Sequence, residues 1–306
     1  MHMKIKFNNL IIFLFFNFLT FSQENSHFGS EKLKGKIKSL KQNSHPAVTK
    51  FGEIVKGERI TGAWYDNDYV KFNENGFAVS YINEFTNYTY LYNAKNQIIE
   101  RKSNSLDETS PKSKIITIYE NNRRIEETTY VYNPEESLTK RHLWEYDNLG
   151  NLMKITVYDS DNKISSVCIN KYDKSGNNIE SRCLDGNGET QYLTIYKYDI
   201  KKNKIEEKNI NEDGSYTLKK YKYDTFLNIV EIKEEDSENV FLNHTQKFKY
   251  INNLLVEESM LDDIDNKVFS IKKYLFVFDK NKNWIKKTII VNDIPKEIIE
   301  RVIEYY

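Results

Sequence analysis

The chain has 306 residues, of which 45 are basic and 45 are acidic, so its formal net charge at pH 7 is zero. This balance removes the usual electrostatic reason to expect a nucleic acid or an anionic membrane as a partner. Hydrophobic residues make up only 39%, whereas 14% are aromatic and 22 are tyrosines, a composition that favours half-exposed β-sheets and an all-β fold.

The first residues have the features of a signal peptide. Lys4 and Lys6 form a positive start, residues 10–21 an apolar run, and Thr20–Ser22 resembles a cleavage site. We expect residues 1–22 to be removed and the mature protein to be secreted or to lie in the periplasm or outer envelope. An uncleaved anchor is the alternative, but a run of about 12 residues is short for a membrane helix, and no later segment predicts a span.

Residues 23–64 are expected to form an N-terminal tail and one or more capping strands. In the segment 33–40, small or apolar residues alternate with lysine, as in a strand with one face in water. The array of repeats is expected to occupy residues 65–306.

The array repeats an aromatic residue, usually followed by Asp, about every 26 residues. The clear pairs are Tyr146–Asp147, Tyr172–Asp173, Tyr198–Asp199, Tyr223–Asp224 and Phe278–Asp279, and Tyr92, Tyr119 and Tyr250 begin degenerate copies. Each Asp opens a turn such as 173–177, and a second turn such as 185–188 follows half a repeat later. Two turns per unit predict two antiparallel strands per unit, about 18 strands in all.

Charged residues that flank the turns predict the strand register. With an even-numbered loop, opposite charges face each other in four hairpins, even where the signs are exchanged. These pairs are Lys171–Glu180, Lys197–Glu206, Lys222–Glu231 and Glu145–Lys154. The same register puts each aromatic opposite the apolar residue seven positions later, for example Tyr172 opposite Ile179. The rival is a three-residue loop with a Gly bulge, which shifts every pair by one.

The two cysteines test this register. Cys168 and Cys183 stand directly opposite in the even register, at a Cα separation of about 4.5–5.5 Å that a disulfide accepts. An exported protein would meet oxidising conditions, which favour the bond. Two free thiols are the alternative.

The pattern Tyr-x-Tyr-Asp-x-x-x-Asn, present at 196–203 and 221–228, resembles the YD repeats of Rhs-type and teneurin-type proteins. The resemblance implies antiparallel sheets that curl into shells. This chain has far fewer repeats than the large members and no Pro-Gly processing motif, and we expect no separate domain after the array, so it is most similar to short, stand-alone exported proteins. We therefore expect an elongated antiparallel sheet of repeated β-hairpins, curved into an open shell or solenoid.

Recognised catalytic and metal-binding motifs are not found in the sequence. The acidic turns 159–161 and 185–189 offer oxygen ligands without completing a calcium loop, and the five histidines lack the spacing of zinc ligands. No nucleophile elbow or phosphate-binding loop occurs. We expect no catalytic residue, no metal and no cofactor.

One tyrosine per repeat forms the candidate binding site. The five members are Tyr146, Tyr172, Tyr198, Tyr223 and Tyr250. They are interpreted either as packing between strands or as an aromatic platform for a glycan or peptide. The predicted function is non-catalytic binding or structural service with a glycan or protein partner. The alternatives are an envelope glycan-active enzyme and an accessory or shell component of a toxin system. Exposed strands at both ends of the array predict self-association through their edges.

Overall fold

The computed structural model describes residues 27–28, 31–59, 67–106, 112–132 and 135–306. The expected signal peptide, residues 1–22, lies outside these ranges. The described chain is almost entirely β-strand. The first half contains β1 (His27–Phe28), β2 (Glu31–Lys32), β3 (Ile37–Lys50), β4 (Glu53–Lys56), β5 (Asp68–Phe72), β6 (Ala78–Ile82), β7 (Thr86–Tyr92), β8 (Ile98–Ser105), β9 (Lys112–Glu120), β10 (Arg123–Tyr132), β11 (Glu136–Tyr146) and β12 (Leu152–Tyr158). The second half contains β13 (Ile164–Tyr172), β14 (Asn178–Asp185), β15 (Thr190–Tyr198), β16 (Lys204–Asn211), β17 (Tyr216–Tyr223), β18 (Ile229–Asp236), the 3-10 helix η1 (Val240–Leu242), β19 (His244–Ile251), β20 (Leu254–Asp262), β21 (Val268–Phe278), β22 (Trp284–Val291) and β23 (Ile294–Tyr305).

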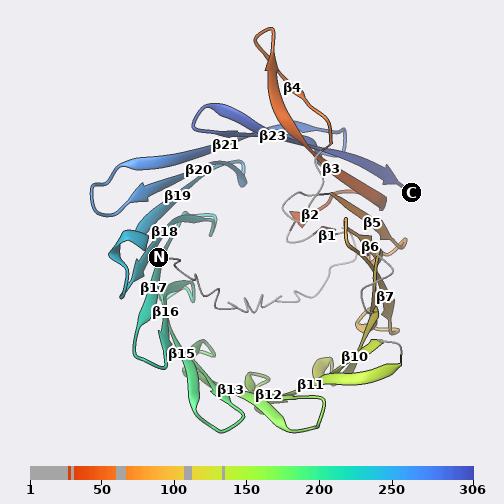
Figure 1. Ribbon diagram of the computed structural model, residues 1–306, viewed down its shortest axis with the longest axis vertical. Helices are drawn as coiled ribbons and strands as arrows, with labels where there is room; N and C mark the ends of the chain where they lie inside the picture. The colour runs from red at the N-terminus through yellow and green to blue at the C-terminus, as the bar shows by residue number, and fades with distance from the viewer. Residues whose placement is uncertain (1–26, 29–30, 60–66, 107–111, 133–134) are drawn as a thin grey trace, which may run out of the picture.

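The strands close into a barrel, as Figure 1 shows. Within the described residues the ring has 20 antiparallel strands, formed by β3 and β5 to β23. Strand β3 closes it, because β3 pairs with β23 on one side and with β5 on the other. Strand β4 pairs with the last part of β3.

The expected open shell or solenoid is therefore wrong. The first long strand and the last strand of the chain pair along most of their length, from Ile37↔Tyr305 to Pro46↔Glu297. Their backbone N–H and C=O groups would otherwise stand unpaired at two edges, and closure removes both edges at once. The edges that motivated the prediction of self-association pair with each other instead.

The Tyr-Asp hairpins combine the two turn geometries considered above. In the turn 173–177, Gly176 has φ +81° and its N–H donates to the carbonyl of Asp173, which is the three-residue loop with glycine. One residue beyond the turn, a bulge restores the even register. Lys171 therefore pairs with Glu180, and Cys168 with Cys183, as predicted. The predicted pairing of the aromatic is wrong, because Tyr172 stands opposite Asn178 and not Ile179.

The Asp of each repeat shapes its turn. Asp173 Oδ1 accepts hydrogen bonds from the backbone N–H of Ser175 and Asn177, at 2.8 and 2.9 Å, and Oδ2 accepts one from the Asn177 side chain at 2.8 Å. The same three bonds recur at Asp147, Asp199 and Asp224. They hold the pKa of these carboxyl groups below its usual value, with the Asn side chain as the largest cause.

Contacts at the closure identify the two faces of the wall. Strand β2 lies inside the ring in Figure 1, and Glu31 of β2 forms an ion pair with Arg301 at 2.9 Å. The hairpin of β3 and β4 projects outside, and its Lys56 pairs with Glu300. Successive side chains of a strand point to opposite faces, so Arg301 and its cross-strand partners face the enclosed lumen, whereas Glu300 and its partners form the outer wall.

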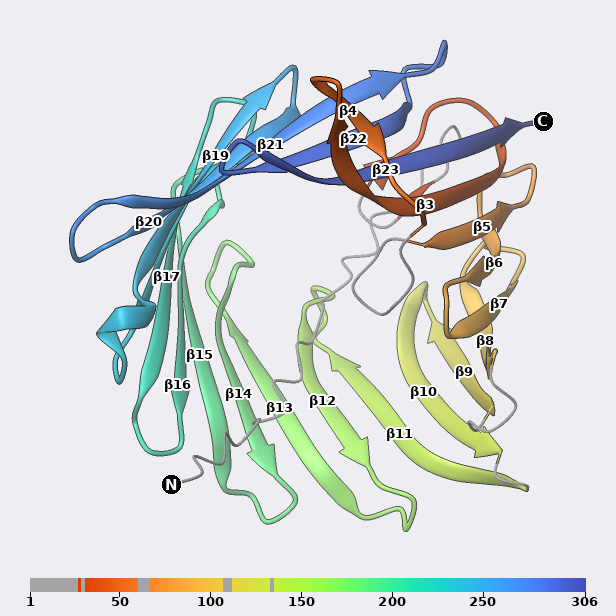
Figure 2. The ribbon, with the colours of Figure 1, turned by 45° about the horizontal axis from the view of Figure 1, so that its top comes forward.

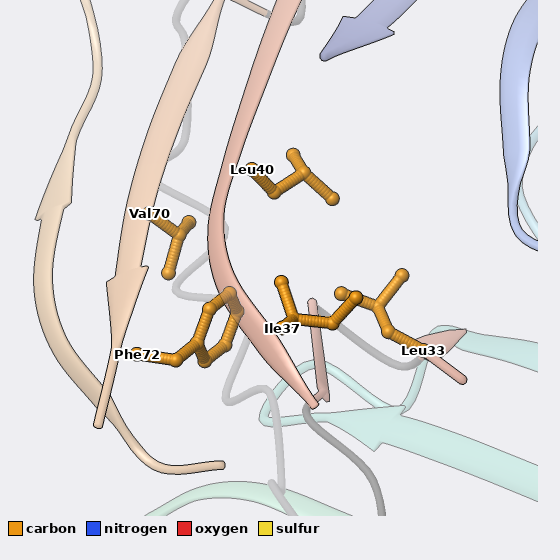
Figure 3. Packing of buried hydrophobic residues seen from close by; sticks show 5 residues of the cluster. All are labelled: Leu33, Ile37, Leu40, Val70 and Phe72. Carbon is orange, nitrogen blue, oxygen red and sulfur yellow. The ribbon is translucent and has the colours of Figure 1, made fainter. Parts of the chain in front are cut away.

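The well-buried apolar core lies at the closure. Leu33, Ile37 and Leu40 are fully buried and pack with Val70 and Phe72, as shown in Figure 3. The segment 33–40 was predicted to be an opening strand; its second half begins β3 and its apolar residues form this cluster. A second cluster joins Trp284, Ile289 and Ile299. No helix in the described part of the chain is long and apolar enough to cross a membrane.

Candidate functional site

The lumen is lined with tyrosines. Strand pairing around the ring places most of the tyrosines on the same face as Arg301. These luminal tyrosines are Tyr81, Tyr88, Tyr90, Tyr92, Tyr119, Tyr146, Tyr172, Tyr192, Tyr196, Tyr198, Tyr221, Tyr223, Tyr250, Tyr274 and Tyr305. Nearly all are half-buried, so part of each ring remains accessible from the lumen. The inner wall therefore offers flat apolar surfaces with hydroxyl groups at their edges.

All five tyrosines predicted as a ladder lie on this inner wall, beside the Tyr-Asp turns. In three of them the hydroxyl group donates a hydrogen bond to a backbone carbonyl of the strand immediately before its own. These bonds join Tyr146 to Arg124 at 2.9 Å, Tyr172 to Leu152 at 3.0 Å and Tyr223 to Lys204 at 2.6 Å. Burial raises the pKa of the phenol in all five. The ladder thus fastens one repeat to the previous one while leaving ring faces in the lumen.

Tyr198 also lines an open groove of about 470 Å³ between two successive Tyr-Asp turns. The groove lies between the turns 173–177 and 199–203, where Lys202 Nζ donates to the carbonyl of Ser175 at 2.7 Å. Its other lining residues are Asp173, Asn177, Ile179, Tyr196, Lys197, Asp199 and Ile200. An aromatic ring, carboxylates and lysine amines in one groove can recognise a molecule that is both polar and flat.

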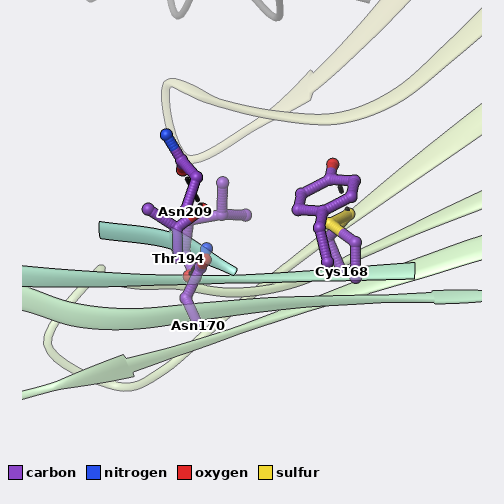
Figure 4. Close-up of a disulfide and its surroundings, with 7 residues drawn as sticks. Cys168, Asn170, Thr194 and Asn209 are labelled. Atoms are coloured by element: carbon purple, nitrogen blue, oxygen red, sulfur yellow. Dashed lines mark hydrogen bonds between the residues drawn. A yellow bond between two sulfur atoms is a disulfide. The ribbon is translucent and has the colours of Figure 1, made fainter. Parts of the chain in front are cut away.

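A row of small polar side chains crosses the inner wall beside the disulfide. Asn170, Ser181, Thr194 and Asn209 follow one another across β13 to β16. Thr194 Oγ1 donates to Asn209 Oδ1 at 2.8 Å. Figure 4 shows Asn170, Thr194 and Asn209 on the same side of the sheet as Cys168. Cys168 and Cys183 form a disulfide with Cα atoms 4.0 Å apart, a bond typical of extracytoplasmic proteins.

Several luminal carboxylates contact neighbouring side chains of the wall. Glu207 contacts Lys204, and Glu234 lies 3.2 Å from Lys219. The Tyr274 hydroxyl donates to Glu258 at 2.8 Å. These carboxylates are therefore engaged within the wall.

A cluster on β10 and β11 was not predicted from the sequence. The Arg124 guanidinium lies 4.0 Å from the ring centre of Trp144 and 3.3 Å from Glu127. The His142 ring also stacks with Trp144, with ring centres 5.6 Å apart. Burial lowers the pKa of His142. The sequence contains one signal for this cluster: His142, Trp144 and Tyr146 are spaced two residues apart, and residues at that spacing in a strand lie on the same face.

The outer wall carries the charge pairs that the sequence predicts. The predicted pairs are confirmed at 2.7–2.9 Å, for example Lys171–Glu180 at 2.9 Å and Lys222–Glu231 at 2.7 Å. The lysine side chains at 171, 197 and 222 are 60%, 62% and 71% exposed. Further charged residues, such as Lys220 with Glu235, lie nearer mid-strand on the same face. The outer face therefore carries many charged side chains.

The two ends of the barrel differ in charge. Because the strands alternate in direction, their turns fall at opposite ends, as Figure 2 shows. The Tyr-Asp rim, formed by turns 73–77, 93–97, 121–122, 147–151, 173–177, 199–203, 224–228, 252–253 and 279–283, has as many lysines as carboxylates. The acidic rim, formed at the other end by the fully described turns 83–85, 159–163, 186–189, 212–215, 237–243, 263–267 and 292–293, has an excess of carboxylates. Its charged residues are Glu84, Asp159, Asp161, Lys163, Glu189, Glu212, Asp213, Glu238, Asp263, Asp265, Lys267 and Asp293.

No group of three or more His, Cys, Asp or Glu side chains in the described ranges is arranged to hold a metal ion. The acidic turn 185–189, considered above for calcium, uses Asp185 Oδ1 to accept from the backbone N–H of Asn187 and Glu189. The carboxylate there shapes the turn.

Comparison with known proteins finds structural likeness without a sequence family. No family model and no curated protein sequence matches the chain. The Tc holotoxin pore of Photorhabdus luminescens, which carries a TccC3 mutation, is 12% identical over 76% of this chain, with a TM-score of 0.30. This chain spans 15% of the length of that toxin chain.

Porin-like proteins of Bacteroides also align along the barrel. The one from Bacteroides uniformis is 10% identical, with a TM-score of 0.36, and the one from Bacteroides vulgatus is 8% identical, with a TM-score of 0.29. Each alignment covers 88% of this chain and 98% of the other. All these TM-scores are below 0.5, so the function of the chain is argued below from its own residues.

Proposed function

We propose that this protein is a non-catalytic extracytoplasmic barrel that binds a polar chain molecule, with a neutral glycan as the first candidate, against its tyrosine-lined inner wall. The observation that carries the proposal is a bias in the distribution of side chains: most of the tyrosines and a row of small polar side chains face the lumen, whereas most of the lysine–glutamate pairs face outward. Aromatic faces beside hydroxyl and amide groups suit a ligand that offers both C–H surfaces and hydroxyl groups. Basic side chains already contact the luminal carboxylates Glu127, Glu207 and Glu234, which disfavours a cationic ligand.

The outer wall belongs in water in this proposal. A barrel embedded in lipid presents an apolar band about 25 Å tall, and each Lys or Arg at the bilayer midplane costs about 2–4 kcal/mol. Lys220, Lys233 and Lys273 lie on the outer face away from the strand ends. We therefore place the barrel in the periplasm or outside the cell, with the disulfide in support.

Kinship with YD-repeat proteins is part of the proposal. Its support is the hairpin itself, in which the Asp caps the turn and the Tyr hydroxyl bonds to a preceding strand. The closed ring of this chain makes it a small self-contained version of such a sheet. A role as an accessory or shell component of a toxin system is an alternative. Binding of a polypeptide in the lumen, in place of a glycan, would favour that role.

An enzyme acting on glycans is the less favoured alternative. Glycosidases use a pair of carboxyl groups about 5–9.5 Å apart, one of them free to give up a proton. Glu127, Glu207 and Glu234 on the inner wall each contact a basic side chain. Each of these carboxylates is thus engaged by a neighbour in the wall, which favours a structural role over a catalytic one.

The test is a glycan array probed with residues 23–306, followed by titration of any glycan retained. Tyr198→Ala removes a ladder ring that lines the groove and is expected to weaken binding about ten-fold or more. Tyr216→Ala removes a ring from the outer wall and is the matched control, expected to leave affinity unchanged. Thermal unfolding of both variants separates lost binding from lost folding. Retention of no neutral glycan, or equal effects of the two variants, would overturn the proposal.

A further inference from the structure

A hairpin arm projects from the barrel beside the acidic rim. Residues 47–50 of β3 pair with β4 beyond the last contact of β3 with β23, and the arm projects from the ring in Figure 1. It leaves the wall at Pro46, opposite Glu297, close to the turn 292–293 of the acidic rim. At its base the N–H of Gly57 donates to the carbonyl of Pro46 at 2.9 Å.

The residue at the tip of the arm is unusual for its turn. Phe51 and Gly52 form a two-residue turn with φ angles of +53° and +84°. Three other hairpins have two-residue turns with positive φ, at 121–122, 252–253 and 292–293, and each begins with Asn, at φ +48°, +52° and +50°. Asn tolerates this left-handed conformation, whereas a bulky aromatic there is strained. The chain thus has Phe where its own matched turns have Asn.

Folding gains nothing from the Phe51 side chain, since its relative exposure is 107%. A strained and fully exposed aromatic, held out on a projecting hairpin, is costly for the isolated protein. Strained residues cluster at ligand contacts, and aromatic side chains are enriched among the residues that dominate protein interfaces. These two properties indicate that Phe51 contacts another molecule.

The charge beside the arm indicates what that molecule is. The acidic rim carries ten carboxylates and two lysines in its fully described turns, whereas the Tyr-Asp rim carries six of each. Three of the ten carboxylates, Glu84, Asp263 and Asp293, pair with Arg59, Lys233 and Lys273, which leaves the acidic rim an excess of five carboxylates. A negative rim steers a positive partner toward it and repels an anionic lipid surface. Charge complementarity therefore favours a basic protein surface over a membrane.

We infer that the arm and the acidic rim together form a docking surface for a basic protein, with the ring of Phe51 inserted into an apolar pocket of that partner. This surface is separate from the lumen, so the inference stands whether or not the barrel binds a glycan. The interface has the common arrangement of an aromatic anchor beside complementary charge.

The experiment places a photo-crosslinking phenylalanine analogue at position 51 of the full-length protein in its native cells, and identifies the adduct by mass spectrometry. The protein identified is then purified, and its affinity for the unmodified barrel is titrated at low and high salt. We expect a basic protein whose affinity falls as salt rises. An adduct with lipid, with a second copy of this chain or with an acidic protein, or the absence of any adduct, would overturn the inference.

Phe51→Asn is the decisive variant, because it restores the residue that the three matched turns use. It should fold at least as stably as the natural chain and bind the purified partner about ten-fold or more weakly. Phe226→Asn, which removes a 72% exposed aromatic at the Tyr-Asp rim, is the control and should bind normally. Glu212→Lys with Glu238→Lys should weaken binding and flatten its dependence on salt. Unchanged affinity of Phe51→Asn would refute the role of the tip.

Discussion

The closure of the barrel and the repeat array are stabilised in different ways. At the closure, Leu33, Ile37, Leu40 and Ile298 are fully buried, and their contacts join the two ends of the chain. In the array, from β11 to β18, apolar residues such as Ile179 remain 37% exposed, and each strand pairs with its neighbours in sequence. The closure thus has a local hydrophobic core, whereas the array is a single layer held by hydrogen bonds.

Specific polar contacts reinforce the contrast. At the closure, the Arg301 side chain donates to Gln42 at 2.7 Å and pairs with Glu31, and Asn283 bonds to the backbone of Lys34 in both directions. In the array, the Asp of each turn and the Tyr that precedes it bond only to the same or an adjacent repeat. The array is therefore stabilised by contacts between neighbouring repeats, as in other repeat proteins. The closure supplies the contacts between the two ends of the chain that close the sheet into a ring.

The largest expected effect is that of truncating the closure core. Leu40→Ala leaves a cavity at a fully buried site, and we expect a loss of about 2–5 kcal/mol in the free energy of unfolding. Ile179→Ala in the array removes a partly exposed side chain, with an expected loss below about 1.5 kcal/mol. Urea unfolding followed by circular dichroism measures both. Equal losses would show that the array is packed as tightly as the closure.

The disulfide gives the array its one covalent cross-link among the described residues. Cys168 and Cys183 are 15 residues apart, and a loop of that length stabilises by about 3 kcal/mol in the chain-entropy model. Adding reductant should lower the melting temperature of the natural protein and leave that of Cys168→Ser/Cys183→Ser unchanged. Reduction of the disulfide should increase the rate of amide hydrogen exchange mainly in β13 and β14. A uniform increase that includes β3 and β23 would mean that the hairpin and the closure unfold as one unit.

Acid should weaken the array before the closure. The folded-state pKa of Asp147, Asp173, Asp199 and Asp224 is below the unfolded value, so their contribution to stability is complete above about pH 5 and is lost as pH falls toward and below the folded pKa. Melting temperatures between about pH 6 and pH 2.5 measure the loss. Asn177→Ala removes the largest cause of the shift at Asp173 and should reduce the acid sensitivity of the 173–177 hairpin. An acid-induced loss of stability confined to β3 and β23 would contradict the prediction that the array is the acid-sensitive region.

Much of the local structure could be predicted because it depends on neighbours in sequence. The pairs Lys171–Glu180 and Cys168–Cys183 lie within one hairpin, so charge patterning and turn residues were enough to align them. The predicted cross-strand partner of Tyr172 was wrong by one residue. The reason is that a three-residue glycine loop and a bulge offset each other, and the residue types alone do not reveal this. The luminal cluster around Trp144 was missed because it joins residues of β10 to residues of β11 that no repeated pattern aligns.

The faces of the wall were only half predictable. Residues two apart in a strand share a face, so Tyr196 and Tyr198 fall on one side and Lys197 on the other, but this alternation does not say which face a sheet turns inward. That choice depends on curvature, and curvature depends on whether the ends of the sheet meet. Arg301 and Glu31, far apart in the chain, show the outcome on the inner side.

By itself the sequence determined the repeating hairpin: its Tyr-Asp turn, the register of its charges and the pairing of its cysteines, since these follow from contacts within a few tens of residues. Tertiary structure alone decided that β3 meets β23, that the sheet closes into a barrel and that the tyrosines line a lumen. The physical reason is that closure depends on the summed twist and curvature of the whole ring and on unpaired edges at opposite ends of the chain, and no single repeat contains either.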